Sequence, residues 1–498
     1  MATGQLDLQR CRQIRSQRDN ALNQTTLVLN EDFSGGHMKG VTFIITLVVF
    51  AICLVLEYGR LTTKPWPPKT FSDPAMEFKY GSIGAEVDGF PYQIWRELPT
   101  IFHDRIPAGW RQFGFIYEGD RELPIGISVR RTAVDRVGFN CATCHTSTYT
   151  LNGAQALVLG APANQLNIQA YLQFIAEAGN DPRLTPDAVF NSAEAAGRPI
   201  NWLSKLVIRY VIFPRLPQQM ADLKQSFGWM ARRPAHGPGR TDAGNFWRER
   251  WGLHPENDDL VGAVDFPSVW HQRIRLNGWF HWDGDNSSLT ERNYSAALAG
   301  GATDWLLDRW SIDKMSDWLL DLPPPKFPTA LDAQKVELGA KIYQREGCGG
   351  CHDATAGRFG QVTDLSVVQT DPQRVTLFSP QMVQYFQQVG AGYSWHFTHY
   401  RSTHGYANMA LDGIWMRAPY LHNGSVPSLD TLLSPAKDRP RTFIRGCDRF
   451  DPMTVGFACS QGFEYDTGLA GNSNERHEFG TMLPPAEKSE LIEYLRSL

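Results

Sequence analysis

The 498-residue sequence has little net charge and few cysteines. It carries 48 Lys and Arg residues against 52 Asp and Glu residues, which gives a formal charge of −4. Because binding to nucleic acid needs a basic surface, this near balance gives no indication of a nucleic-acid partner. With only eight Cys in the chain, their spacing is the most informative feature of the sequence.

Four of the eight cysteines form two copies of C-x-x-C-H, one at 141–145 (CATCH) and one at 348–352 (CGGCH). Two thiols at this spacing can form thioether bonds to one haem, while the adjacent histidine ligates its iron. A zinc ribbon would place its two C-x-x-C halves about 15 to 20 residues apart, whereas these two motifs are separated by about 200 residues. A thioredoxin-like site would need a βαβ context, and the sequence predicts none around either motif. The sequence therefore predicts two covalently bound haem c groups, attached at Cys141, Cys144, Cys348 and Cys351, with the iron ligands His145 and His352.

A charge-free apolar run occupies 41–56 (VTFIITLVVFAICLVL). Extended to Tyr58, it would form a helix about 27 Å long, enough to cross a bilayer core. No A-x-A cleavage site follows it, and arginines and Lys39 precede it, which places its N-terminal side in the cytoplasm. We therefore expect an uncleaved transmembrane signal-anchor at 41–58, a single pass through the bacterial inner membrane, and haem domains in the periplasm.

The segment before the apolar run is polar, and it ends with a pattern that is typical of a translation start. Met38 and Lys39 directly before the run resemble a translation start. We therefore expect 1–40 to be a cytoplasmic N-terminal segment, of which 1–37 are not translated.

The remaining chain divides at its proline-rich stretches, 59–74 and 321–328, which we interpret as linkers. Between them we expect a first haem c domain at 75–320, with a Ser- and Thr-rich turn after the first motif, and after them a second cytochrome c domain at 329–498. Helical spacing predicts one helix leading into the second motif and another that begins at Pro485. The expected fold class is mainly α, with two cytochrome c-like haem domains, long irregular loops and one N-terminal transmembrane helix.

Two longer stretches carry a resemblance to a known family. FHWDGDNSSLTERN at 280–293 and APYLHNGSVPSLDTLL at 418–433 resemble the two signatures of bacterial di-haem cytochrome c peroxidases and of the related methylamine-dehydrogenase maturation enzyme. The rubber oxygenase branch is closer, because its LDGIW, PYLHNGSVPTL, FDP-x-x-VGF and GNSN-x-x-HE-x-G patterns correspond to 411–415, 419–429, 450–457 and 471–480. The resemblance covers roughly 130–498 and implies di-haem redox chemistry without indicating a substrate.

Three residues compete as sixth ligand of the second haem. The resemblance to rubber oxygenases implies bis-histidine ligation through His477, in GNSNERHEFG. Met416 matches the position of a methionine in some di-haem peroxidases, and Met482 precedes the last helix, as in mono-haem cytochromes c. We favour His477, then Met416, then Met482.

No sixth ligand is evident for the first haem. The aromatic segment 265–282, which also contains His271 and His281, supplies the distal-pocket candidates Trp270, Phe280 and Trp282, although packing between the domains explains such rings equally well. An open iron position can bind a small molecule. The peroxidases place a glutamate after their first signature, whereas this chain has no acid from 292 until Asp304, so general acid/base cleavage of peroxide is disfavoured.

The expected function is therefore that of a membrane-anchored periplasmic di-haem cytochrome. As an oxidoreductase it would react dioxygen at the first haem and use the second as a low-spin electron relay, with an unknown redox partner. The alternatives are a di-haem peroxidase, for which peroxide is the oxidant, and an electron carrier without catalysis. In the exported part, Cys447 and Cys459 are expected to form a disulfide, the alternative being two buried thiols.

Overall fold

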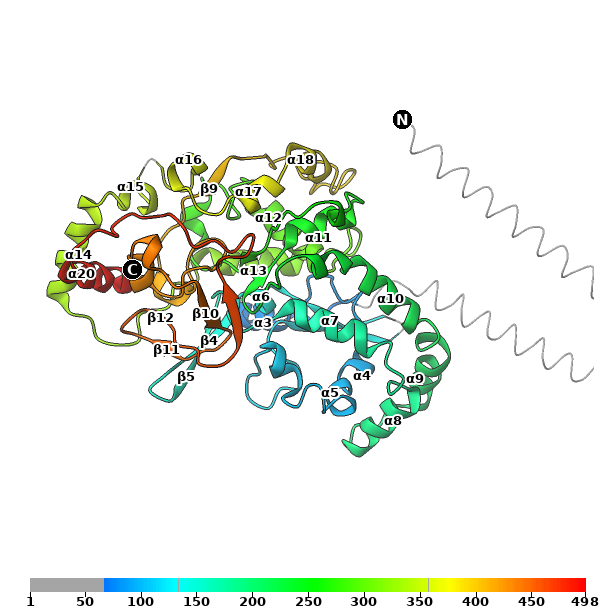
Figure 1. Ribbon diagram of the computed structural model, residues 1–498. Helices are drawn as coiled ribbons and strands as arrows, with labels where there is room; N and C mark the ends of the chain where they lie inside the picture. Colours follow the sequence, from blue (N-terminus) through cyan, green and yellow to red (C-terminus); the bar gives the residue numbers. More distant parts are fainter. Residues whose placement is uncertain (1–66, 133, 357) are drawn as a thin grey trace, which may run out of the picture. The chain divides into compact units, whose positions relative to one another are not determined.

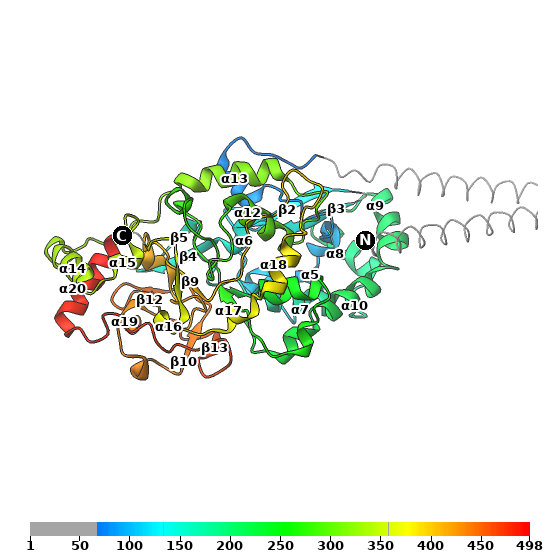
Figure 2. The ribbon, with the colours of Figure 1, turned by 90° about the horizontal axis from the view of Figure 1, so that it is seen from above.

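The computed structural model describes residues 67–132, 134–356 and 358–498 (Figures 1 and 2). Before residue 322 the α-helices are α3 (Pro74–Tyr80), α4 (Tyr92–Trp95), α5 (Leu98–Ile101), α6 (Cys141–Cys144), α7 (Ile168–Ala178), α8 (Pro186–Ala195), α9 (Trp202–Val207), α10 (Leu216–Ser226), α11 (Ala243–Arg250), α12 (Leu289–Ala299) and α13 (Arg309–Asp321). After it come α14 (Ala333–Arg345), α15 (Gly349–His352), α16 (Leu365–Val368), α17 (Gln373–Leu377), α18 (Pro380–Phe386), α19 (Leu429–Leu432) and α20 (Pro485–Ser497). Shorter helical turns are η2 (Gly109–Phe113), η3 (Ile208–Ile212), η4 (Gly228–Arg232), η5 (Pro255–Asn257), η6 (Gln272–Arg275), η7 (Ile414–Arg417) and η8 (Ala436–Asp438).

Strands are distributed among these helices as small antiparallel sheets. The order in the three-stranded sheet is β1-β3-β2, and the other strands pair as β4-β5, β6-β7, β8-β9, β10-β13 and β11-β12. Their bounds are β1 (Phe90–Pro91), β2 (Ile127–Arg131), β3 (Asp135–Phe139), β4 (Thr146–Leu151), β5 (Ala154–Leu159), β6 (Arg240–Thr241), β7 (Val264–Asp265), β8 (Val362–Asp364), β9 (Gly405–Ala407), β10 (Thr442–Arg445), β11 (Phe450–Asp451), β12 (Gly456–Phe457) and β13 (Phe463–Asp466).

The predicted fold class is wrong. Helix accounts for 39 % and strand for 12 % of the structure, so the fold is mixed α and β rather than mainly α. Within the described ranges, no helix combines the length and apolar character needed to cross a membrane. The expected span at 41–58, the segment 1–40 and the first half of the linker, 59–66, lie outside the described residues.

One cause of this error is the hairpin that follows the first motif. β4 and β5 pair from Thr146↔Leu159 to Leu151↔Ala154. Asn152 and Gly153 form the turn with φ values of 51° and 80°, the backbone conformation that Asn-Gly adopts in a two-residue hairpin loop. Because β-branched threonine favours extended backbone, the segment we expected to be a Ser- and Thr-rich turn is a strand.

The predicted helices around the second motif are confirmed. α14 leads into the motif and packs against α20, which begins at Pro485, and both views show the two helices side by side. Gly339 allows their close approach, because a Cβ atom there would lie 2.0 Å from the carbonyl oxygen of Glu490.

The segments on either side of 321–328 share their cores, and the residues from 67 onward form one compact unit. One cluster of buried residues combines Phe78 and Trp247 with Phe378. A second combines Val158 with Trp415. The division into haem domains at 321–328 stays a prediction, and the two segments it separates are extensively packed together.

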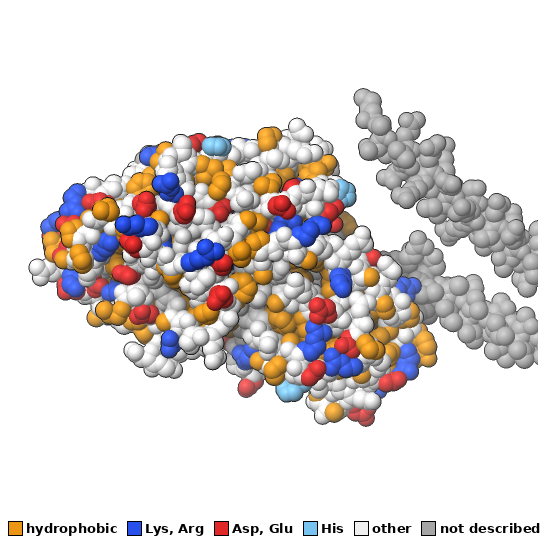
Figure 3. Space-filling view, in the orientation of Figure 1, with side chains coloured by type: hydrophobic (Ala, Val, Ile, Leu, Met, Phe, Trp, Pro, Cys, Tyr) orange, Lys and Arg blue, Asp and Glu red, His pale blue; other side chains and the backbone are white. Residues whose placement is uncertain are grey.

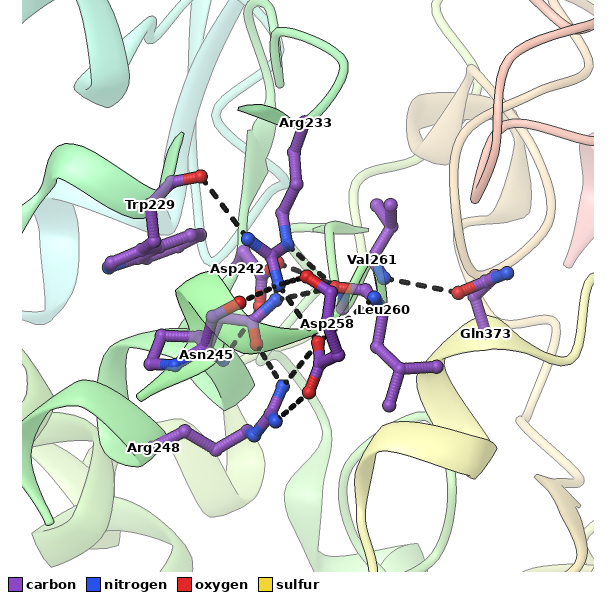
Figure 4. Close-up of polar contacts among 11 residues, drawn as sticks. Trp229, Arg233, Asp242, Asn245, Arg248, Asp258, Leu260, Val261 and Gln373 are labelled. Atoms are coloured by element: carbon purple, nitrogen blue, oxygen red, sulfur yellow. Dashed lines mark hydrogen bonds and ion pairs between the residues drawn. The ribbon is translucent and has the colours of Figure 1, made fainter. Parts of the chain in front are cut away.

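A buried ion-pair network adds to this packing (Figure 4). The carboxylate of Asp258 pairs with both Arg233 and Arg248, and the Nε of Arg233 donates to the carbonyl oxygen of Leu260 at 2.7 Å. The next residue, Val261, donates its N–H to the side chain of Gln373 on α17 at 3.1 Å. The network therefore connects the loop before β7 to a helix of the second segment. On the surface, by contrast, acidic and basic side chains are interspersed (Figure 3).

The predicted disulfide is confirmed. Cys447 and Cys459 are joined, with their Cα atoms 5.5 Å apart. The four motif cysteines are free and therefore available for thioether bonds.

Candidate haem sites

The second motif is folded so that its three functional side chains share one helical face. Gly347, with φ of 78°, separates α14 from α15. The N–H of His352 donates to the carbonyl oxygen of Cys348 at 3.0 Å. Residues at i, i+3 and i+4 of such a turn project to the same side, so Cys348, Cys351 and His352 can reach one haem.

The ring of His352 is held in the orientation that a ligand needs. Its Nδ1 lies 2.7 Å from the carbonyl oxygen of Met409, so Nδ1–H donates to that oxygen and Nε2 keeps its lone pair. Burial lowers the pKa of His352, which keeps the imidazole neutral. A neutral imidazole oriented by a backbone carbonyl is the usual form of a metal-ligating histidine.

A cavity of about 470 Å³ opens in front of this motif. Both motif cysteines, His352 and His477 line it. Aliphatic side chains provide much of the remaining wall: Leu411, Ile414, Leu429, Leu432, Leu433, Leu491 and Leu495. A third histidine of the lining, His422, has its Nε2 2.9 Å from the hydroxyl oxygen of Tyr406. A largely apolar cavity with two thiols and the imidazoles of His352 and His477 matches the chemistry of a covalently attached haem.

His352 and His477 face each other at the separation that one shared iron requires. Their ring centres are 6.4 Å apart. A metal–imidazole bond is about 2.0–2.1 Å long and the ring nitrogen lies about 1.1 Å from the ring centre, so two imidazoles on opposite sides of one metal have centres about 6.2–6.4 Å apart. Burial lowers the pKa of His477 to about 4, so this imidazole is neutral as well.

The loop that carries His477 has an unusual backbone and a dedicated support. Arg476 and His477 both have positive φ, 67° and 51°, a conformation that is unfavourable for residues with a side chain. The buried guanidinium of Arg439 donates to the carbonyl oxygens of Asn474 at 2.5 Å, Arg476 at 2.7 Å and His477 at 3.3 Å. The same guanidinium also donates to the carbonyl oxygen of Leu432 at 3.2 Å. Arg439 therefore fixes the loop against the cavity wall.

The two methionine candidates lie elsewhere. Met416 is fully buried in the core cluster that contains Trp415, and it does not line the cavity. Met482 is 86 % exposed. The geometry therefore favours His477 as the ligand opposite His352.

The first motif begins with a side-chain cap. Asn140 accepts the N–H of Ala142 at 3.0 Å and thereby starts α6, on which Cys141 and Cys144 lie. His145 follows directly, and its Nδ1 lies 2.8 Å from the carbonyl oxygen of Pro267. Burial lowers the pKa of His145 to about 4. The ring is neutral and oriented by a carbonyl, as at the second motif.

A buried arginine lies beside the first motif. The guanidinium of Arg292 acts electrostatically on both Cys141 and His145, and it lowers the pKa of His145 further. Burial lowers the pKa of Arg292 itself to about 10. Its Nη2 donates to the side-chain oxygen of Gln272 at 2.9 Å, and its Cζ lies 5.6 Å from the ring centre of Phe280. This places a positive charge in an otherwise aromatic environment.

The three predicted distal-pocket residues do not gather in one place. Phe280 lies beside Arg292, near the first motif. Trp282 lines the cavity of the second motif and donates its indole N–H to the carbonyl oxygen of Asp265 at 2.9 Å. Trp270 is fully buried between the two segments and donates to the carbonyl oxygen of Asp412 at 3.0 Å. Trp270 thus fits the alternative of packing.

The glutamate within the first signature stretch is already engaged. Glu291 is buried, and its carboxylate accepts the N–H groups of Thr398 and His399 at 2.8 and 3.1 Å and the side chain of Asn286 at 3.0 Å. The Nδ1 of His399 lies 2.6 Å from the same carboxylate. Because these contacts saturate the carboxylate, Glu291 has a structural role.

One short loop belongs to both sites. Asp265, Phe266, Pro267 and Ser268 all line the cavity of the second motif. The carbonyl oxygen of Pro267 is also the acceptor for His145. The predicted iron ligand of the first site is therefore one hydrogen bond away from the wall of the second.

Sequence reasoning did not find the supporting residues. Arg439 lies in RPRT, where no motif distinguishes it, and the carbonyl groups of Met409 and Pro267 have no sequence signature at all. Arg292 is part of the first signature stretch, LTERN, where its position was visible but its burial beside Cys141 was not.

Comparison with known proteins finds one family model and two relatives that this chain resembles. Residues 405–444 match the family model described as RoxA-like, cytochrome c-like. Uncharacterized protein y4iJ of Sinorhizobium fredii is 25 % identical over 511 residues, covering 78 % of this chain and 84 % of the relative. Uncharacterized protein y4iM of the same organism is 29 % identical over 247 residues, covering 44 % of this chain and 55 % of the relative. Residues 405–444 thus resemble a RoxA-like cytochrome c domain, a kind of domain that carries covalently bound haem c.

Proposed function

We propose that the protein is a di-haem c-type oxidoreductase whose two haems have different tasks. Cys141, Cys144 and His145 would hold one haem, and Cys348, Cys351 and His352 the other. When bound, such a haem supplies an iron that exchanges one electron and, if an axial position is open, binds a small ligand. The observation that carries the proposal is the facing pair His352 and His477 across an apolar cavity, 6.4 Å between ring centres.

At the second site this chain's residues favour electron transfer. With a haem held by Cys348, Cys351 and His352, the imidazoles of His352 and His477 would both ligate its iron and would leave no position for an oxidant. The carbonyl oxygen of Met409 fixes the ring of His352, and the guanidinium of Arg439 fixes the backbone that carries His477. A site that changes little in geometry is suited to rapid electron exchange.

The shared loop supports a relay between the sites. His145 donates to Pro267, and Pro267 borders the cavity of the second motif. Trp282 borders the same cavity, while Phe280, two residues earlier, lies beside Arg292 and the first motif. We infer that electrons pass between the haems through this loop and these rings.

At the first site the residues favour binding of a small oxidant, with dioxygen preferred over peroxide. Arg292 is a buried cation near His145 and can stabilise negative charge that develops on a bound oxidant. Glu291, by contrast, is saturated by four contacts and is not available as the acid that peroxide cleavage wants. We further propose a redox partner of unknown identity. The Cys447–Cys459 disulfide supports a location in an oxidising compartment outside the cytoplasm.

Carbon monoxide titration of the reduced protein tests this division of tasks. We expect one equivalent to bind to the wild type and up to two to bind to His477→Ala, because removing the imidazole opens the second site. His404→Ala is the matched control, since that histidine side chain is 75 % exposed and pairs with Asp364 on the surface. No binding to the wild type would favour an electron carrier without catalysis, and two equivalents would contradict the role of His477.

A further inference from the structure

A stretch of four exposed apolar side chains lies on the helix formed by α9 and η3, far in the sequence from both haem motifs. Trp202, Leu203, Leu206 and Tyr210 are 73, 56, 46 and 68 % exposed. At about 100° per residue these positions fall within an arc of about 100°, which is one face of a helix. We call this set the 202–210 face.

The opposite side of the same helix is buried. Ile208 and Ile212 belong to the core cluster that contains Leu216 of α10. The helix also has a defined start, because the side chain of Asn201 accepts the N–H of Ser204 at 2.9 Å. The helix is therefore firmly attached, and the exposure of the 202–210 face follows from the fold rather than from a loose segment.

Basic side chains border this face. Between 201 and 226 the chain has Lys205, Arg209, Arg215 and Lys224 but only one acid, Asp222, although the whole chain is net negative. Lys205 and Arg209 each extend over the ring of Phe190, both 5.4 Å from its centre, at the edge of the 202–210 face. Arg209 also pairs with Asp187 of α8, so the excess positive charge at this edge comes from Lys205, Arg215 and Lys224. Hydrophobic side chains and charged side chains of both signs lie side by side at this end of the molecule, over α8 to α10 (Figure 3).

We propose that the 202–210 face binds in the interface of an anionic lipid bilayer. A helix lies in the plane of a membrane when aromatic and leucine side chains occupy one side and Lys and Arg flank it. Trp and Tyr prefer the headgroup level, since their rings are apolar with one polar end. Anionic headgroups complement the local positive charge, whereas the net negative remainder of the chain is repelled. This orients the molecule with α9 toward the lipid.

Photo-crosslinking tests the proposal with the full-length holoprotein. Vesicles of phosphatidylethanolamine and phosphatidylglycerol carry a photoactivatable phosphatidylglycerol, and peptide mass spectrometry maps the adducts along the chain. This local readout separates the 202–210 face from any other contact with lipid. We expect adducts on 199–224 in the wild type, and we expect added salt to reduce them. They should fall roughly ten-fold in Trp202→Ser/Tyr210→Ser, because this variant lacks the two rings that the bilayer would bury.

Trp305→Ser/Trp310→Ser provides the matched control. These two tryptophans are also exposed, at 63 and 55 %, and lie away from α9, so their loss should leave adducts on 199–224 unchanged. Circular dichroism of both variants checks folding. Three outcomes would each overturn the proposal. They are equal adduct density on 199–224 and 303–312, unchanged adducts in Trp202→Ser/Tyr210→Ser, and a wild-type dimer in sedimentation that this variant abolishes. The outcome is independent of the haem assignments.

Discussion

Replacement of Arg439 by Met should release the ligand His477 from the second site. The guanidinium of Arg439 donates to three carbonyl groups of the loop at 474–477. Hydrogen bonds from a charged donor contribute about 1.5–3 kcal/mol each. Against them stands the positive φ of two successive residues, Arg476 and His477, which costs about 1–3 kcal/mol per residue.

The magnitudes decide the outcome. Without the arginine, the backbone strain is no longer offset and three carbonyl groups lose their donor. Because Glu475 and Arg476 are exposed, water replaces the guanidinium at some of these carbonyl groups, and only part of the hydrogen-bond energy is lost. We therefore expect the free energy of unfolding to fall by about 2–4 kcal/mol. We also expect part of the second haem to become high-spin or water-ligated, because His477 no longer keeps its position.

Electron paramagnetic resonance and optical spectra of the holoprotein measure this change, with chemical unfolding in parallel. Arg441→Met is the matched control, since that arginine lies two residues away, is 75 % exposed and pairs with Asp466 on the surface. Arg439→Lys should restore part of the low-spin signal. A fully low-spin Arg439→Met protein whose free energy of unfolding falls by less than about 0.5 kcal/mol would refute this role of Arg439, because a loss that small is typical of surface substitutions.

Three further predictions concern attachment, packing and pH. Denatured protein should retain the mass of two haems, and Cys144→Ala or Cys351→Ala should each weaken attachment of one; a bare-polypeptide mass contradicts both sites. Gly339→Ala should lower the free energy of unfolding by about 1–3 kcal/mol through the clash with α20, whereas Gly228→Ala, with open space around it, should not. Burial raises the pKa of Asp283 to about 6, so the folded protein binds this proton more tightly than the unfolded chain and stability falls as pH rises from about 4 to 6. The melting temperature of Asp283→Asn should therefore rise relative to that of the wild type between about pH 4 and pH 6. Above about pH 6 the difference between the two melting temperatures should stay constant.

The predicted haem attachment points can be recognised from the sequence alone, because each motif consists of five consecutive residues. Cys348, Cys351 and His352 need only one helical turn to come together, and the helix before them follows from its apolar spacing. His477 was found through a family pattern, because no local rule distinguishes it from other histidines. Arg439, Arg292 and the carbonyl of Pro267 act across long sequence separations, and such contacts leave no periodic or spacing signal.

The strand content was missed for a different reason. Thr146–Leu151 was interpreted as a turn because of its small polar residues, although Asn152-Gly153 after it is a hairpin signal. The β-branched threonines and the Asn152-Gly153 turn together favour a strand more strongly than the small polar residues favour a turn. The distal-pocket candidates were chosen from one aromatic segment, but a segment that runs through a core sends its side chains to different environments, as Trp270 and Trp282 show.

With a haem bound at each motif, the loop at 265–268 would make the two redox potentials interdependent. A proline fixes its own φ and restricts the residue before it, so the backbone of Phe266 and Pro267 has little freedom. Any shift of the Pro267 carbonyl alters the basicity of the His145 imidazole and at the same time reshapes the lining of the other cavity. A substitution in this loop that is selected for one haem thus changes the other too. The chain cannot tune its two haems separately at this point.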